Sequence, residues 1–332
     1  MKLQGFIFWM RLLTSASLLA LDSTPPPSSL KWPEMPSKES PYLFIFDLTC
    51  YGGLVNGLTE ELVFAQTEEG KIFKLSQLDW KIQDLWIIGG RATVRLLDEQ
   101  LFGLCCTLDG WGKAASRSSV MVDRDWDPNF SFETPSDISW STSHLLSAYK
   151  VASELGFDLY QKKWRSAQLQ SALLLGYQYF ELAWKDKGGR YIYDYGTYVG
   201  FFPNETGISY SQEFSIPYLG LGTSGKWKER IQWTCYGKIS SLAFVHQKDI
   251  HHLREITYDE KILNGTYWML GALLSVSFSK YFDCHIKYDY EQMNQTEGIT
   301  TIYAKDKPPK TLLGSGVYHQ HQILSLGVSS SF

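Results

Sequence analysis

The sequence predicts an all-β protein, a single antiparallel transmembrane β-barrel, and three observations support this prediction. Apolar and polar residues alternate along many segments, aromatic residues make up 15% of the chain, and the last residues form a two-faced strand. In that strand Leu324, Leu326 and Val328 share one parity, whereas Ser325 and Gly327 share the other. Because successive side chains on a strand point to opposite faces, this strand is suited to close a barrel against the first one.

Composition excludes several other classes of protein. The formal net charge of −4 gives no basic surface for nucleic acid. No apolar stretch approaches the roughly 20 residues that a membrane-spanning helix needs, and 12 Trp with 20 Tyr fit two aromatic girdles at membrane interfaces. A soluble β-sandwich also alternates, but its polar face is usually rich in Lys and Glu, whereas this chain uses Ser, Gly, Gln and Thr.

The N-terminal residues predict an exported protein. Residues 1–21 are predicted to be a signal peptide, with positive charges at Lys2 and Arg11 before a short apolar run, although no clean small-residue cleavage site follows. The alternative is a tail that is never cleaved. Residues 22–40 are rich in proline and predict a flexible segment.

Residues 41–332 are predicted to form one barrel domain. At about 20 to 25 residues per strand with its connection, this length gives roughly ten to twelve strands. The more hydrophilic stretches near residues 123–143, 185–206, 246–260 and 289–310 are predicted to be extracellular loops or strand extensions above the membrane.

Five cysteines occur at irregular spacing, and their odd number fits neither a disulfide framework nor a zinc site. Thiols packed on strand faces are the favoured interpretation. One disulfide is the alternative, and the sequence does not indicate which pair would form it. The cysteines are Cys50, Cys105, Cys106, Cys235 and Cys284.

Two short motifs could carry chemistry. Asp123 and Asp125 share one face of an extended segment, so their charges repel, one pKa rises, and a proton or water can be shared between them. Asp249 and His251 also share a face, and an acid beside an imidazole orients the ring and raises its basicity. If the two pairs face each other across a groove, a water held between them makes a plausible hydrolase.

Each motif alone is a weak signal. A pair of aspartates two residues apart is more often a solvated loop or a cation site. The Asp249–His251 pair, followed by His252, also fits a surface loop or a fortuitous metal site. No nucleophile elbow, phosphate-binding loop or zinc-protease motif is present, and no cysteine has an evident histidine partner.

Beyond these residues, the chain resembles the omptins, outer-membrane aspartyl-type endopeptidases of Gram-negative bacteria, from about residue 41 to 332. The order and spacing of several blocks carry the resemblance. They are Leu75–Lys81, Met121–Trp126, Gly176–Gln178, Gly188–Tyr193, Phe202–Asn204, Pro217–Leu221, Asp249 with His251, and Ile256–Tyr258.

The resemblance implies a ten-stranded barrel in the cell outer membrane that extends above the membrane, with an active groove at its extracellular rim. It implies that Asp123 and Asp125 form one catalytic wall and that Asp249 and His251 form the other. The Asp–His couple would activate a water that attacks the scissile carbonyl, with no covalent intermediate, metal or other cofactor.

Omptins cleave polypeptides between basic residues, and the resemblance implies a pocket for a basic side chain. Glu61 matches an acidic group of that pocket, and Met121 and Ile208 match its apolar walls. The second acidic position is Gln247 here, with Lys248 beside it, which predicts a weaker negative field and a lower affinity or a broader choice of substrate.

The lipopolysaccharide site of omptins is poorly matched. Tyr177 is kept, but the next members of the cluster are Tyr179 and Glu181, and the basic position is Glu213. Acidic residues cannot pair with lipid phosphates. Either the lipid differs, or activation does not use this site, or it uses other cations such as Arg190, so a requirement for lipopolysaccharide stays open.

The sequence therefore predicts an omptin-like endopeptidase that cleaves beside basic residues at the cell surface. One family loop is altered to Ser136–Ser141, so the target protein is expected to differ. The first alternative is a weak or inactive barrel that acts as a surface adhesin or invasin. The second is a passive pore, which should have an unobstructed polar lumen.

Overall fold

The computed structural model describes residues 42–66, 70, 72–98, 103–127, 129–131, 133–163, 167–228, 230–279 and 282–331. These residues all belong to the unit of residues 42–332. The predicted signal peptide of residues 1–21 and the proline-rich segment of residues 22–40 lie outside the described residues. No helix in the described ranges is long and apolar enough to span a membrane.

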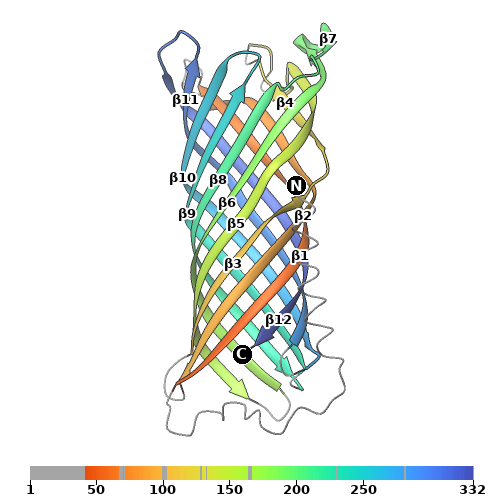
Figure 1. Ribbon diagram of the computed structural model, residues 1–332. Helices are drawn as coiled ribbons and strands as arrows, with labels where there is room; N and C mark the ends of the chain where they lie inside the picture. Colours follow the sequence, from red (N-terminus) through yellow and green to blue (C-terminus); the bar gives the residue numbers. More distant parts are fainter. Residues whose placement is uncertain are drawn as a thin grey trace. The chain divides into compact units, whose positions relative to one another are not determined.

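The described unit consists almost entirely of long strands (Figure 1). Its elements are β1 Tyr42–Gln66, β2 Ile72–Asp98, β3 Leu104–Ala115, β4 Ser119–Asp125, β5 Asp137–Lys163, β6 Ala167–Tyr193, η1 Asp194–Gly196, β7 Tyr198–Phe201, β8 Ile208–Trp227, β9 Ile231–His251, β10 Ile256–Ser277, β11 Phe282–Ala304 and β12 Lys310–Ser331.

These strands fill ten positions of a closed antiparallel ring. β3 and β4 both lie between β2 and β5, so they are two halves of one strand interrupted at residues 116–118, whereas β7 adds only to β6. β12 pairs with β11 on one side and with β1 on the other, from Asp47↔Ser331 to Val63↔Ser315. The predicted ten-stranded barrel is confirmed.

Alternation along each strand separates an apolar outer face from the interior. Leu324 and Leu326 are 48% and 64% exposed, whereas Ser325 between them is 3% exposed, so the last strand has the two faces predicted from its sequence. Similar exposed apolar side chains surround the same end of the barrel and suit contact with lipid. They include Phe44 and Leu48 on β1, Ile88 and Val94 on β2, Val151 and Leu155 on β5, Leu219 and Leu221 on β8, and Leu270 and Leu274 on β10.

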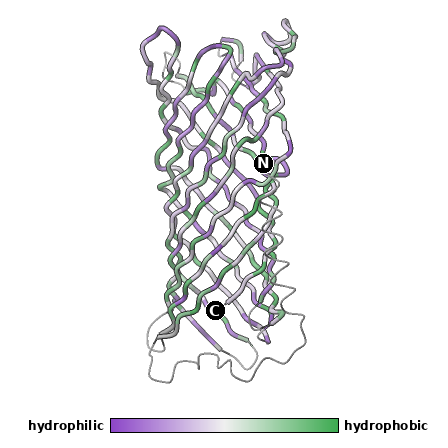
Figure 2. The backbone as a smooth tube through the Cα atoms, viewed as in Figure 1, coloured by the Kyte–Doolittle hydropathy of each residue, from purple (hydrophilic) through white to green (hydrophobic). Residues whose placement is uncertain are grey.

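The barrel extends well beyond its apolar belt. Strands such as β8 and β2 have 20 and 27 residues, about two to three times the 9–11 that a membrane crossing needs. At the belt end, β5 and β6 are separated only by residues 164–166, whereas residues 126–136 and 194–207 form long connections at the other end. Outer-membrane barrels have short periplasmic turns and longer extracellular loops, so the second end is extracellular, and hydrophilic residues gather there (Figure 2).

The extracellular hydrophilic stretches are mostly strand extensions. Between the long strands at this rim lie only residues 126–136, 194–207, 252–255 and 305–309, together with residues 67–71. Where the connection is short, at residues 252–255 and 305–309, the strands continue almost to the turn. This continuation places side chains near the rim with the strict two-residue periodicity of a sheet.

Buried aromatic side chains fill the interior below the rim. Trp80 stacks on Tyr210 at 5.2 Å between ring centroids, and Trp184 lies 5.9 Å from both rings. Phe180 and Phe214 stack at 4.1 Å. All five side chains are at most 2% exposed, so the barrel is packed at this level.

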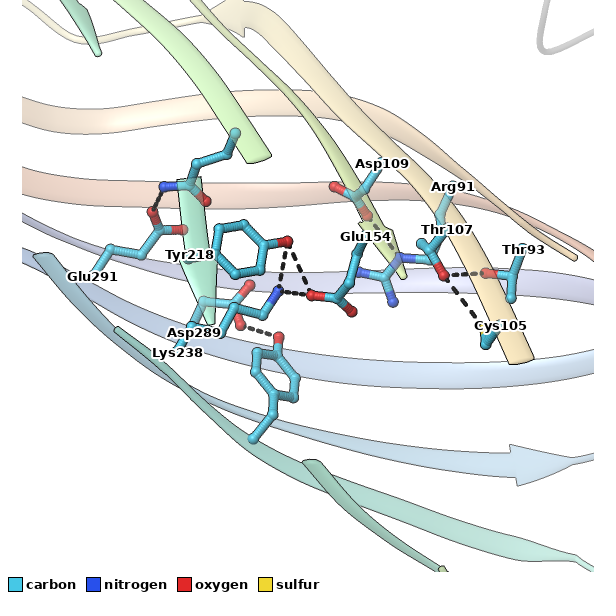
Figure 3. A network of polar contacts seen from close by, with 12 residues as sticks. Arg91, Thr93, Cys105, Thr107, Asp109, Glu154, Tyr218, Lys238, Asp289 and Glu291 are labelled. Atoms are coloured by element: carbon cyan, nitrogen blue, oxygen red, sulfur yellow. Dashed lines mark hydrogen bonds and ion pairs between the residues drawn. The ribbon is translucent and has the colours of Figure 1, made fainter. Parts of the chain in front are cut away.

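A polar network occupies the interior nearer the apolar belt (Figure 3). Arg91 Nε lies 2.7 Å from Asp109 Oδ2, and Lys238 Nζ lies 2.5 Å from Glu154 Oε2. Tyr218 donates a hydrogen bond to the same Glu154 carboxylate at 2.9 Å. These pairs surround a cavity of about 250 Å³, and their mutual neutralisation makes the buried charges tolerable.

The five cysteines are all unpaired, and the structure forms no disulfide among them. Cys50, Cys106, Cys235 and Cys284 are exposed on the outer face, and Cys105 is half-buried. This arrangement agrees with the interpretation favoured from the sequence, in which the thiols lie on strand faces.

Candidate active site

Two strand ends bring the predicted catalytic residues to the extracellular opening of the barrel. Asp123 and Asp125 lie at the end of β4, and Asp249 and His251 lie at the end of β9. β5, β6 and β8 separate β4 from β9 around the ring, so the two pairs come from opposite walls. Asp123 and His251 line one pocket. The two sequence motifs therefore meet in a single groove.

Asp249 and His251 form an oriented acid–imidazole couple. Residues two apart on a strand share a face, and the Oδ2 atom of Asp249 lies 2.5 Å from Nε2 of His251. Burial alone would lower the pKa of His251, but the hydrogen bond and the charge of Asp249 outweigh it and raise that pKa. Asp249 is 1% exposed. With the Nε2 proton donated to Asp249, Nδ1 is the nitrogen that can accept a proton.

Asp123 and Asp125 form a carboxylate pair in which a protonated carboxyl group is favoured. Burial, followed by the charge of Asp125, raises the pKa of Asp123 to about 8. Burial also raises the pKa of Asp125. The Ser76 hydroxyl donates to Asp123 Oδ1 across a long 3.5 Å contact. Near neutral pH this wall can therefore offer both a hydrogen-bond donor and acceptors to a bound water or oxyanion.

Arg254 is a site residue that the sequence reasoning missed. It lies in the turn directly after β9 and lines the same pocket as Asp123 and His251. Burial raises the pKa of Asp123 and Asp125, and the positive charge of Arg254 opposes that rise. The available signal was a cation three residues after His251.

The predicted specificity residues lie at two depths. Met121 and Ile208 line the pocket with Asp123 and His251, and its volume is about 70 Å³. Glu61 is 1% exposed, so a substrate side chain reaches it only after a neighbouring side chain moves. Burial raises the pKa of Glu61 well above its ordinary value, and the charge of Asp249 adds to this effect.

Asp186 is a second residue that sequence reasoning missed. Its Oδ1 atom accepts hydrogen bonds from the backbone nitrogens of Gly207 and Ile208 at 3.0 and 2.5 Å. Its Oδ2 atom accepts one from Ser141 at 2.8 Å. Asp186 therefore fixes the start of β8 and, with it, the apolar wall contributed by Ile208.

Lys248 does not face the groove, contrary to the expectation that it weakens the negative field there. Alternation along β9 buries Gln247 in the interior and leaves Lys248 exposed on the outer face. Its ammonium group is therefore separated from the groove by the barrel wall. Of these two residues, only Gln247 faces the interior.

The segment Ser136–Ser141 is mostly strand rather than loop, because β5 begins at Asp137. Ser139 and Ser141 are buried, and Ser139 lines the catalytic pocket. The segment therefore shapes the groove from its wall. A rim loop of residues 126–136 precedes it.

The residues discussed above for a lipopolysaccharide site lie on the outer face. Glu181 accepts a hydrogen bond from the Tyr149 hydroxyl at 2.8 Å, and Tyr177 is 44% exposed. Glu213 lies 4.0 Å from His246. Arg190 stacks over the Trp140 ring at 4.6 Å. The carboxylates of Glu181 and Glu213 therefore lie on this outer surface.

Replacing Glu61 with glutamine is expected to raise the thermal unfolding temperature, and to do so more at about pH 8 than at about pH 5. Burial raises the folded-state pKa of Glu61 well above 4.5. The unfolded chain therefore releases this proton first, and the wild type loses stability as the pH rises above that value. Glu213→Gln, on the outer face, is the control; an advantage independent of pH would contradict this expectation.

The closed ring, its lipid-facing belt and the groove at its extracellular rim define an outer-membrane β-barrel with a candidate hydrolytic site. The chain belongs to the omptin family, whose model matches residues 46–332.

Individual relatives extend over most of the chain. The plasminogen activator of Yersinia pestis is 27% identical over 296 residues, 86% of this chain and 89% of that protein. The outer membrane protease OmpP of Escherichia coli strain K12 is 28% identical over 294 residues, 84% and 88% of the two chains. The crystal structure of the outer membrane protease OmpT from Escherichia coli superposes with a TM-score of 0.79 at 24% identity, covering 87% of this chain and 97% of that one. The last comparison shows a shared fold.

Proposed function

We propose that this protein is a cell-surface endopeptidase of the outer membrane that hydrolyses peptide bonds next to basic residues through a directly activated water. The Asp249–His251 couple, placed in one groove with the Asp123–Asp125 pair, is the observation that carries the proposal. Membership of the omptin family and the protease names of relatives such as OmpP support the peptidase class.

The reaction is a single displacement by water. A water held between the two walls gives a proton to Nδ1 of His251 while its oxygen attacks the scissile carbonyl carbon. The tetrahedral oxyanion accepts a hydrogen bond from the protonated carboxyl of Asp123. His251 then gives its proton to the amide nitrogen as the C–N bond breaks, which releases a carboxylic acid and an amine.

A preference for basic residues is supported by the acid content of the groove. Glu61, Asp249 and Asp123 lie close enough to influence each other's charge. A guanidinium or ammonium group would neutralise them, and the planar fork of Arg matches a carboxylate especially well.

The test is cleavage of quenched fluorescent peptides by refolded barrel, with and without lipopolysaccharide. We expect a peptide containing Arg-Arg to be cleaved, and its citrulline analogue, which is neutral and of similar shape, to be cleaved at least about 10-fold more slowly. Comparison of the two lipid conditions measures the lipopolysaccharide requirement. Absence of cleavage across a peptide library, in folded protein with lipid, would contradict the proposal.

Exposed rim residues favour a surface adhesin as the second candidate. Phe130, Tyr198 and Phe201 are 76%, 63% and 82% exposed at the extracellular end. Such side chains suit contact with another protein. A folded barrel that cleaves no peptide but binds host-cell surfaces would favour this candidate. The packed aromatic interior disfavours a passive pore.

A further inference from the structure

Two buried carboxylates lie beneath the groove, on well-separated strands. Glu61 comes from β1 and Glu260 from β10, and they are 1% and 0% exposed. The charged groups that act most strongly on the pKa values of Glu61 and Glu260 are all carboxylates. The Oε2 atom of Glu61 has no hydrogen-bond partner within the described part of the chain. Uncompensated buried acids are costly, so their presence requires an explanation.

Glu260 lies beside position 247, where the resemblance to omptins led us to expect a second acid. On the β9–β10 ladder it lies directly opposite Gln247. Glu260 Oε2 accepts a hydrogen bond from Gln247 Nε2 at 2.8 Å, and Glu260 Oε1 accepts one from Thr300 at 3.0 Å. The carboxylate that β9 lacks is therefore present on the neighbouring strand at the same level.

Gln247 itself cannot supply a free acceptor. Its Oε1 atom accepts hydrogen bonds from the Tyr210 hydroxyl and from Gln212 Nε2, each at 2.5 Å. These donors fix the amide so that its nitrogen points to Glu260. The side chain is 0% exposed and fully engaged, so the negative charge in this layer comes from Glu260.

The acids suit a site that is filled by a cation. Burial is the main cause that raises the pKa of Glu260 to about 8, and burial also raises that of Glu61. Without a ligand the two carboxyl groups can hold protons and avoid two uncompensated charges. An entering cation would displace those protons and form a charge-assisted contact in a low-dielectric environment.

We propose that Glu260 is a second specificity-determining residue, which together with Glu61 selects the Arg or Lys side chain of the substrate. This inference rests on the proposed function. The sequence predicted a weaker negative field because Gln247 on β9 carries no charge. In this proposal Glu260 on β10 supplies the missing negative charge.

The test compares kcat/KM for matched peptides with Arg or citrulline before the scissile bond. In Glu260→Gln we expect the Arg-over-citrulline preference to fall about 10-fold, mainly through a higher KM for the Arg peptide. Citrulline cleavage should stay within about twofold of wild type, because a neutral side chain loses no ion pair. Asp259→Asn is the control, since it removes the adjacent carboxylate, which faces outward and lies 3.3 Å from His246.

A swapped variant separates charge from folding. Glu260→Gln combined with Gln247→Glu returns a carboxylate to β9, and we expect it to recover most of the Arg preference. The role of Glu260 would be overturned if Glu260→Gln kept the preference, or if it lowered Arg and citrulline cleavage equally. A wild type that cleaves both peptides equally, or neither, would overturn the proposed function as well.

Discussion

Replacing His251 with alanine should lower kcat by about 10³-fold and leave KM nearly unchanged, because a positioned general base contributes roughly 10²–10⁴-fold. The proposed base is His251, which Asp249 orients through the 2.5 Å contact. Without the imidazole, the attacking water loses the base that Asp249 holds in place. Steady-state kinetics with the Arg-Arg peptide measures both constants.

His246→Ala is the matched control for this experiment. His246 lies on the same strand, but on the outer face beside Glu213 and Asp259. It should retain wild-type kcat. A His251→Ala variant that folds and keeps more than about a tenth of wild-type kcat would contradict the role of His251 as general base.

Changes at Asp123 should have the second largest effect. Asp123→Ala removes the group proposed to donate to the oxyanion and should lower kcat by about 10²–10³-fold. Asp123→Asn keeps a neutral donor of similar shape and should lose less activity. Asp127→Asn, in the adjoining rim loop, is the control. Equal losses in Asp123→Asn and Asp123→Ala would contradict a donor role for the protonated acid.

The same variants should change the pH profile of kcat/KM in a defined direction. Although burial alone would lower the pKa of His251, its Asp249 contact raises it above 6.5, so activity should rise with pH as the ring loses its proton. Burial raises the pKa of Asp123 to about 8, so activity should fall above that pH as the donor ionises. Asp123→Asn should remove the alkaline fall. A wild-type profile that stays flat through pH 8 would contradict this assignment.

Much of the fold follows from the alternation of residue types alone. The last strand, with Leu324 and Leu326 opposite Ser325, predicts a lipid face and an interior face, and both are present. The motif of Asp249 and His251 likewise predicts a hydrogen-bonded couple, because two residues on a strand span one pleat. Both predictions depend only on residues close together in the sequence, so they need no knowledge of how distant strands pair.

Other parts of the site depend on how distant strands meet. Glu260 is placed beneath the groove through its register with Gln247, and Asp186 is placed at its wall through its contacts with Gly207 and Ile208. Neither pairing has a local sequence signal. The outward direction of Lys248, by contrast, could have been predicted from its parity relative to Asp249.

The most direct measurement is a double-mutant cycle in kcat/KM with the Arg-Arg peptide, using folded Asp123→Ala, His251→Ala and the combined variant. If both walls act on one water, the losses in kcat/KM should be strongly non-additive. The kcat/KM of the combined variant should then lie within about 10-fold of that of the less active single variant. Fully additive losses would show that the two walls act independently. Retention of activity in all three variants would contradict the assignment of this groove as the active site.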